Sequence, residues 1–198
     1  MNGPSTTGRA TCSRCLRPQM TCLCALARPT DHCTEVLVLQ HPQEQRQAKN
    51  SVALLRLSLA HCEVVVGERF APAPPAPATA AGSSLRLVVI DATWRKSLRM
   101  LLEHPPLAAL PRLALEAPAP TRYRAIRAAR RADHVSTLEA TEQALAMLEG
   151  PGFDAAPLLD AFGCFVGGVA ARQGYRADRR PELQRHADQG NHEQAVRR

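Results

Sequence analysis

Short runs of consecutive apolar residues, each ending in a polar residue, recur along the first half of the chain. Residues 36–39 read Val-Leu-Val-Leu before a glutamine, and residues 87–90 read Leu-Val-Val-Ile before Asp91. Runs of this kind, rich in β-branched residues, are typical of strands buried on both faces of a parallel sheet. Shorter runs over residues 64–66 and 113–116 predict two further strands. The run that ends in Asp91 is expected to be a central strand.

Between these runs the apolar residues change to spacings of three and four, which indicate amphipathic helices. The longest series predicts one helix between the first two strands, with apolar positions at Ala48, Val52, Leu55, Leu59 and Cys62. Further helices are expected over residues 95–103, 136–149 and 154–173. Strands that alternate with helices in this order predict an α/β fold, with helices flanking a mostly parallel sheet.

Polar side chains stand where the two strongest strands pass into helices. Asp91 directly follows one apolar run, and His41 and Glu44 lie at the helix start that follows the other. Ligands of open parallel sheets bind at the carboxyl ends of the strands, so these side chains are candidates for a site. The alternative is structural: Asp91 caps the next helix, the only tryptophan, Trp94, fills the core, and His41 is a turn residue before a proline.

The helix predicted over residues 136–149 starts with Ser136 and Glu139, which have the spacing of a capping box. The capping box alone explains these two residues structurally. The exposed N–H groups of a helix start also attract anions, so the backbone near Ser136 and Thr137 is a candidate for binding a carboxylate.

Four of the seven cysteines gather within 13 residues near the N-terminus. They form Cys-x2-Cys and Cys-x-Cys pairs at Cys12, Cys15, Cys22 and Cys24. Disulfides rarely persist in a reducing compartment, and four thiolates at this density suit tetrahedral structural zinc; free thiols or a redox pair are the alternatives. Four protein ligands leave no open coordination position, so we assign the zinc to folding or RNA docking. The remaining cysteines are expected to be small core residues: Cys33, Cys62 and Cys164.

The net charge of the chain indicates a polyanionic partner. The 198 residues carry a formal net charge of +7, and almost all the positive charge is arginine. A basic domain favours nucleic acid as partner, although an aromatic content of 4% argues against many stacked bases. The most basic stretch is either a solvated face or an RNA contact, and we favour the contact. Its candidate RNA-binding residues are Arg122, Tyr123, Arg124, Arg127, Arg130 and Arg131.

Composition also divides the chain. Residues 1–11 are a flexible N-terminus without the apolar segment of a secretory signal, residues 12–32 are the zinc-binding segment, and residues 33–175 are the α/β domain. The proline- and alanine-rich residues 70–84 predict an exposed loop, and residues 176–198 a disordered polar tail. No apolar run approaches the roughly 20 residues of a membrane span. We therefore expect a cytoplasmic protein with no membrane partner and no obligate protein partner.

The order of these motifs resembles the DTW-domain family. The matching segments are the paired cysteines, His41-Pro42-x-Glu44, Asn50-Ser51, Asp91-x-Thr93-Trp94 and Ser136-Thr137-Leu138-Glu139-Ala140. The resemblance covers residues 12–170 and depends on order and spacing rather than on any single motif. It implies a SPOUT-like α/β fold, whose cofactor pocket involves a C-terminal trefoil knot, and the activity of a tRNA-uridine aminocarboxypropyltransferase.

Enzymes of that class move the 3-amino-3-carboxypropyl group of S-adenosylmethionine onto N3 of a tRNA uridine and release methylthioadenosine. The resemblance thus implies S-adenosylmethionine as co-substrate and tRNA as partner. Asp91 is the candidate catalytic residue, either as the base that accepts the N3 proton or as a ligand of the methionine ammonium, with proximity driving the transfer. The candidate cofactor-binding residues are His41, Pro42, Glu44, Thr93, Trp94, Ser136, Thr137 and Glu139.

Two other functions fit the sequence less well. An RNA methyltransferase would use the same cofactor but release S-adenosylhomocysteine. A zinc-dependent RNA-binding module would bind tRNA without any cofactor. The second alternative leaves the polar residues at the strand ends, Asp91 and His41, without a role.

Overall fold

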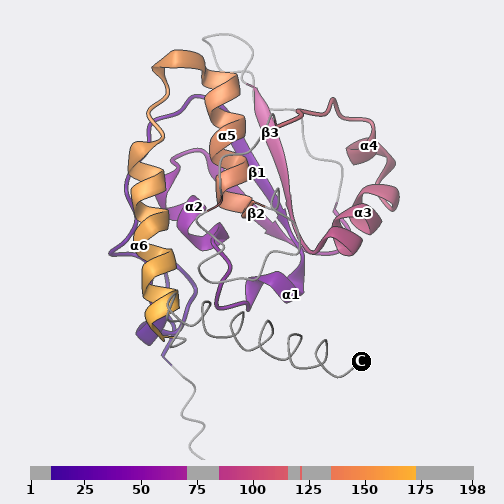
Figure 1. Cartoon of the computed structure of the whole chain (residues 1–198). Coiled ribbons are helices and arrows are strands. Elements are labelled where there is room, and N and C mark those ends of the chain that lie inside the picture. Colours follow the sequence, from indigo (N-terminus) through magenta and orange to yellow (C-terminus); the bar gives the residue numbers. More distant parts are fainter. Residues whose placement is uncertain (1–9, 71–84, 116–120, 122–134, 173–198) are drawn as a thin grey trace, which may run out of the picture.

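Three parallel strands form the sheet in the computed structural model of the protein, which describes residues 10–70, 85–115, 121 and 135–172. β1 (Glu35–Gln40) lies between β2 (Cys62–Val66) and β3 (Arg86–Asp91), as Figure 1 shows. The structure therefore confirms the predicted α/β class with a parallel sheet. The predicted strand at 113–116 is wrong for residues 113–115, which lie outside any strand.

Among the described strands, β1 is central and β3 is at an edge. Val38 of β1 is fully buried on one face, and Leu37 and Leu39 are 5–6% exposed on the other. Residues 87–90 of β3 are only half-buried. The prediction that the Asp91 strand is central was therefore wrong. Its apolar run has another cause: both faces of this edge strand pack against core residues, so both need apolar side chains.

Helices cover both faces of the sheet (Figure 1). The helices on one face are α2 (Val52–Ser58), α5 (Thr137–Glu149) and α6 (Ala156–Arg172), and those on the other are α3 (Trp94–Leu102) and α4 (Pro105–Ala108). The larger hydrophobic core lies on the first face, where Val36 and Val38 meet the fully buried Phe162 and Phe165 of α6. The smaller core, on the second face, centres on Met100 of α3.

The helix predicted between β1 and β2 is split into α1 (Pro42–Gln45) and α2, which are joined by residues 46–51. α2 begins at Val52, whose N–H donates to the side-chain oxygen of Asn50 at 3.0 Å. Ala48 is exposed in the connecting loop, and Cys62 is the first residue of β2. The prediction of one continuous helix was therefore wrong, because the N–H groups of Gln47 and Asn50 form turns within the loop and that of Val52 bonds to a side chain.

The other predicted elements are confirmed. β2 contains residues 64–66, α3 begins one residue before its expected start, and α6 occupies most of residues 154–173. α5 carries the predicted capping box: the Ser136 hydroxyl oxygen accepts the N–H of Glu139 at 3.2 Å, and the Glu139 carboxylate accepts the N–H of Ser136 at 2.8 Å.

Several predictions concern residues outside the described part of the chain. These residues belong to the N-terminus (1–9), the proline- and alanine-rich loop (71–84), the arginine-rich stretch (122–134) and the C-terminal tail (173–198). The trefoil knot also stays a prediction, since the connection from β3 to α5 is described only in part. Within the described residues, no helix has both the length and the apolar character needed to cross a membrane.

Truncation of Phe162 tests the larger core. Because its side chain is fully buried, we expect Phe162→Ala to lower the free energy of unfolding by about 3–5 kcal/mol in urea titrations. Leu102→Ala is the control, since Leu102 is 72% exposed and its truncation should change stability by less than about 0.5 kcal/mol. Equal losses in the two variants would contradict this assignment of the core.

Candidate active site and metal centre

Asp91 is the last residue of β3 and lies beside Gln40, the last residue of β1, in the register of the sheet. Side chains alternate along a strand, so Asp91 points to the same face as Leu87 and Val89, which pack on the larger core. The starts of α2 and α5 lie on that face. The Asp91 carboxylate is therefore directed into the protein, and the residue is only 5% exposed.

Three neutral donors from three different elements hold the Asp91 carboxylate. Oδ2 accepts hydrogen bonds from Nε2 of Gln40 at 2.8 Å and from Nδ2 of Asn50 at 2.7 Å. Oδ1 accepts one from Oγ1 of Thr137 at 2.6 Å. The side chain thus joins β1, the loop before α2 and the first turn of α5, and its orientation is fixed.

Asp91 does not cap the helix that follows it. The N-cap residue of α3 is Thr93, whose carbonyl accepts the N–H of Ser97 at 2.8 Å. The structural alternative for Asp91 is therefore wrong, since its side-chain bonds are directed to the other elements described above.

His41 lies in a turn, and its ring makes two polar contacts. It is buried and is the N-cap of α1, where Nδ1 accepts the N–H of Gln43 at 3.1 Å. Nε2 therefore carries the proton in the neutral ring, and it lies 3.2 Å from a carboxylate oxygen of Glu68. The backbone N–H of His41 donates to the carbonyl of Asp91, so the two strand ends are tied together. Pro42 and Glu44 belong to the same short helix.

At the start of α5, only Thr137 reaches Asp91 directly. The Ser136 hydroxyl is engaged in the capping box. Glu139 is buried, and its Oε2 accepts both the N–H of Ser136 and the hydroxyl of Thr121 at 2.7 Å. Among the predicted residues of this segment, Ser136 and Glu139 thus order the helix start, and Thr137 contacts the candidate catalytic residue.

Two residues of the Asp91 network, Gln40 and Asn50, were missing from the predicted site residues. Gln40 carried the signal of a polar residue that ends a buried strand, as Asp91 does. Asn50 was noted only as part of a motif. Neither residue has an ionisable side chain, and a search for catalytic groups from sequence therefore passes over both.

The four N-terminal cysteines converge as predicted. Their sulfur atoms all lie within 4.8 Å of one another, with 3.6 Å between Cys12 and Cys24 and 3.8 Å between Cys15 and Cys22. A tetrahedral zinc ion with Zn–S bonds of roughly 2.3 Å requires sulfur atoms about 3.8 Å apart. The cluster therefore fits a metal ion, and zinc suits its all-sulfur donor set.

The thiols of this cluster differ in acidity. Backbone N–H groups of Cys15 and Arg14 lower the pKa of Cys12 to about 6, whereas burial and the neighbouring thiols raise the pKa of Cys24 to about 12. The Cys24 thiol therefore holds its proton more tightly than the Cys12 thiol does. A metal ion that binds all four sulfurs would displace that proton.

The prediction for the remaining cysteines holds for one of them. Cys62 packs against the larger core, and burial raises its pKa to about 12. Cys33 and Cys164 are exposed, so their expected core positions were wrong.

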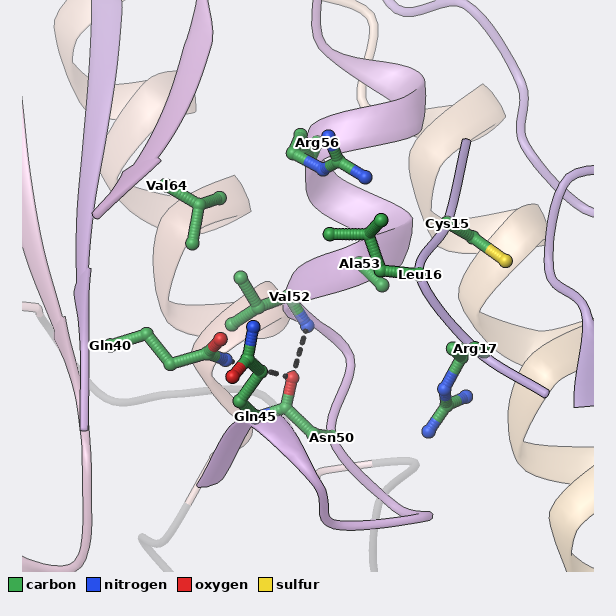
Figure 2. A pocket seen from close by; sticks show the side chains of 10 residues that line it. All are labelled: Cys15, Leu16, Arg17, Gln40, Gln45, Asn50, Val52, Ala53, Arg56 and Val64. Atoms are coloured by element: carbon green, nitrogen blue, oxygen red, sulfur yellow. Dashed lines mark hydrogen bonds between the residues drawn. The ribbon is translucent and has the colours of Figure 1, made fainter. Parts of the chain in front are cut away.

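A cavity of about 110 Å³ lies between the cysteine segment and the carboxyl ends of the strands (Figure 2). Its polar lining consists of three amides and two guanidinium groups, on Gln40, Gln45, Asn50, Arg17 and Arg56. Gln40 and Asn50 also donate to Asp91, so the wall of the cavity and the Asp91 network share two side chains.

A model of the DTW domain matches residues 9–84 and 75–169, which together span the cysteine cluster, the Asp91 network and both core faces. This chain belongs to the DTW family.

Relatives of this DTW protein carry one kind of name. The chain is 41% identical over 66 residues to tRNA-uridine aminocarboxypropyltransferase 2 of Macaca fascicularis, covering 31% of this chain and 22% of that protein. It is 28% identical over 170 residues to the Drosophila melanogaster protein of the same name, and this match covers 71% of this chain and 67% of that protein. It is 28% identical over 135 residues to tRNA-uridine aminocarboxypropyltransferase A of Arabidopsis thaliana, and this match covers 47% of this chain and 50% of that protein. No solved structure matches the chain.

The tryptophan of this DTW protein lies at the surface. Trp94 is the first residue of α3 and is 76% exposed, so the alternative that it fills the core is wrong. Leu98 and Leu102 are also exposed, at 59% and 72%, and follow Trp94 at intervals of four along the helix. α3 therefore presents an apolar stripe that begins three residues after Asp91.

The arginine-rich stretch of the DTW protein lies outside the described residues, and its RNA contact stays a prediction. Thr121, immediately before it, is described and buried. Because the Thr121 hydroxyl donates to Glu139, Thr121 itself is held against the first turn of α5.

Replacement of one clustered cysteine tests the metal centre. We expect the wild-type protein to contain about one equivalent of zinc, and Cys22→Ser to lose it, because serine does not supply a thiolate ligand. Cys33→Ser, at an exposed cysteine outside the cluster, should retain the metal. Metal content by atomic emission measures both. Full zinc occupancy in Cys22→Ser would contradict four-sulfur coordination.

Proposed function

We propose that this DTW protein transfers the 3-amino-3-carboxypropyl group of S-adenosylmethionine to N3 of a uridine in tRNA. The observation that carries the proposal is the family match over residues 9–169 together with relatives that are named tRNA-uridine aminocarboxypropyltransferases. A fixed carboxylate at the carboxyl edge of a parallel sheet, where α/β folds bind ligands, supports it. The net charge of +7 supports a polyanionic substrate.

The proposed reaction is a nucleophilic substitution at carbon. The N3 nitrogen of uridine forms a bond to the γ-carbon of the methionine moiety, and the bond from that carbon to sulfur breaks. The electron pair of the broken bond stays on sulfur, so the positive sulfonium becomes neutral methylthioadenosine. The N3 proton goes to a base. Placement of the two reactants and one proton acceptor are therefore all that the protein supplies.

Asp91 is our candidate for the proton acceptor. Its Oδ2 receives two donors, whereas its Oδ1 receives one from the described residues and keeps a lone pair for the uridine N3–H. The three donors fix the direction of that lone pair without neutralising the charge. As a rival role, the same oxygen would hold the ammonium of S-adenosylmethionine.

The first turn of α5 is our candidate for the carboxylate of the cofactor. The capping box occupies the N–H of Glu139, and the N–H of Ala140 donates to the carbonyl of Ser136. The first two N–H groups of the helix, on Thr137 and Leu138, have no partner within the helix itself. The Thr137 hydroxyl donates to Asp91, so one short segment would hold the carboxylate while Asp91 faces the transferred group.

Nucleoside analysis tests the proposed function. Unmodified tRNA is incubated with purified protein and S-adenosylmethionine, then digested for mass spectrometry. We expect a uridine heavier by one aminocarboxypropyl group and release of methylthioadenosine. A methylated nucleoside with S-adenosylhomocysteine would instead indicate a methyltransferase. Binding of tRNA without any modified nucleoside would indicate an RNA-binding module.

Asp91→Asn tests the proposed base. The amide cannot accept the N3 proton, so the transfer rate should fall by about 100-fold or more. Asp160→Asn, at an exposed position of α6, is the control and should match the wild type. Circular dichroism establishes that both variants fold. If Asp91 instead binds the ammonium, Asp91→Asn should chiefly raise the KM for S-adenosylmethionine, and a folded variant with full activity excludes both roles.

Trp94 is our candidate for stacking on the adenine of the cofactor. It is the only tryptophan of the chain, so intrinsic fluorescence reports on it directly. We expect S-adenosylmethionine alone to quench the emission, and Trp94→Ala to weaken cofactor binding about 5- to 100-fold, the usual effect of losing one base–aromatic stack. Leu98→Ala is the control on the same exposed stripe. Quenching by tRNA but not by cofactor would assign Trp94 to the RNA instead.

A further inference from the structure

Arg17, in the cysteine segment, contacts the loop that carries Asn50. Its Nη2 donates to the carbonyl of Gln47 at 3.1 Å and to the carbonyl of Ala48 at 2.6 Å. Both carbonyls belong to the connection between α1 and α2, about 30 residues further along the chain. A single guanidinium group thus joins the cysteine segment to this loop.

The same loop places Asn50 against Asp91. The backbone N–H of Asn50 donates to the carbonyl of Gln47 at 3.0 Å, which is one of the two carbonyls that Arg17 holds. The Asn50 side chain donates to Asp91 at 2.7 Å and accepts from Gln40 at 3.2 Å. Displacement of the Gln47 carbonyl would therefore move a donor of the Asp91 carboxylate.

The position of Arg17 depends in turn on the cysteine cluster. Its own carbonyl accepts the N–H of Cys12 at 2.8 Å, and it follows the buried Cys15 by two residues. Leu16, between them, has φ of 58°, a backbone conformation that leucine rarely adopts. On the other side, the guanidinium lies over the ring of Phe165 in α6, 5.7 Å from its centre. The backbone of Arg17 is thus held by the cysteine cluster, and its guanidinium group is held by Phe165 in the core.

Figure 2 shows Arg17 on the cysteine-segment side of the cavity and Gln40 on the strand side, with Asn50 between them. From this chain of contacts we infer that Arg17 is a positioning residue, which transmits the geometry of the cysteine cluster through the 46–50 loop to the Asp91 carboxylate. A closed four-sulfur centre would then influence the transfer reaction without touching either substrate. The kinetic consequence rests on the proposed function, and the structural link does not.

Replacement of Arg17 tests the kinetic consequence. In Arg17→Met the contacts to both carbonyls are lost, so kcat should fall about 10- to 100-fold, as small misplacements of catalytic groups do, while the KM for tRNA stays within about twofold. Arg17→Lys retains a charged donor but not the planar fork, and an intermediate kcat is expected. The control is Arg28→Met, because Arg28 lies in the same segment and, among the described residues, its guanidinium bonds only to the nearby carbonyls of Ala25 and Ala27. A raised KM for tRNA with unchanged kcat would make Arg17 an RNA contact and overturn the inference.

A structural readout separates this inference from the proposed function. The side-chain amide signals of Asn50 in a 15N-labelled protein are assigned by their loss in Asn50→Ala. They should shift in Arg17→Met and not in Arg28→Met, with zinc content unchanged in both. A shift in a protein that transfers nothing would support the positioning link while the proposed function fails. If the Asn50 signals do not shift in Arg17→Met, the inference is overturned, whatever the activity of the variant. If Arg17→Met does not fold, Arg17→Lys is used for the same measurement.

Discussion

The burial of one carboxylate constrains the site of this protein. An ionised side chain inside a protein is costly unless hydrogen bonds replace the water that it loses. Asp91 receives such bonds from Gln40, Asn50 and Thr137, which come from the neighbouring strand, from the loop before α2 and from the start of α5. The carboxyl edge of the sheet is therefore held in one arrangement, because each of these elements must keep its place for the charge to remain solvated by the protein.

The surroundings of this carboxylate divide into a rigid and an exposed part. His41 and the capping box of Ser136 and Glu139 use their polar groups to order the chain around the strand ends. Trp94 does the opposite, since it presents a large apolar ring to solvent close to the buried charge. The proposed transfer between two bound molecules would need both properties: a fixed group at the reacting atoms and open surface on which the flat parts of the ligands lie.

The cysteine segment is part of the domain and not an appendage. Leu23, between two of the cluster cysteines, is buried in the larger core. Arg17 and Arg56 bond to carbonyls across the boundary, the first to the loop before α2 and the second, from α2, back to Arg14. The cysteine cluster and the Asp91 network thus share one framework.

The sequence alone determined the features that are encoded locally: the parallel strands, the capping box of α5, the convergence of four closely spaced cysteines and the position of Asp91 at a strand end. Each could be predicted from a pattern of residues that are near one another in the chain. The tertiary structure decided the rest. The edge position of β3 among the described strands, the exposure of Trp94 and the donors Gln40 and Asn50 all depend on which elements meet in space. Apolar periodicity predicts that a side chain is buried, but it does not predict which element packs against that side chain.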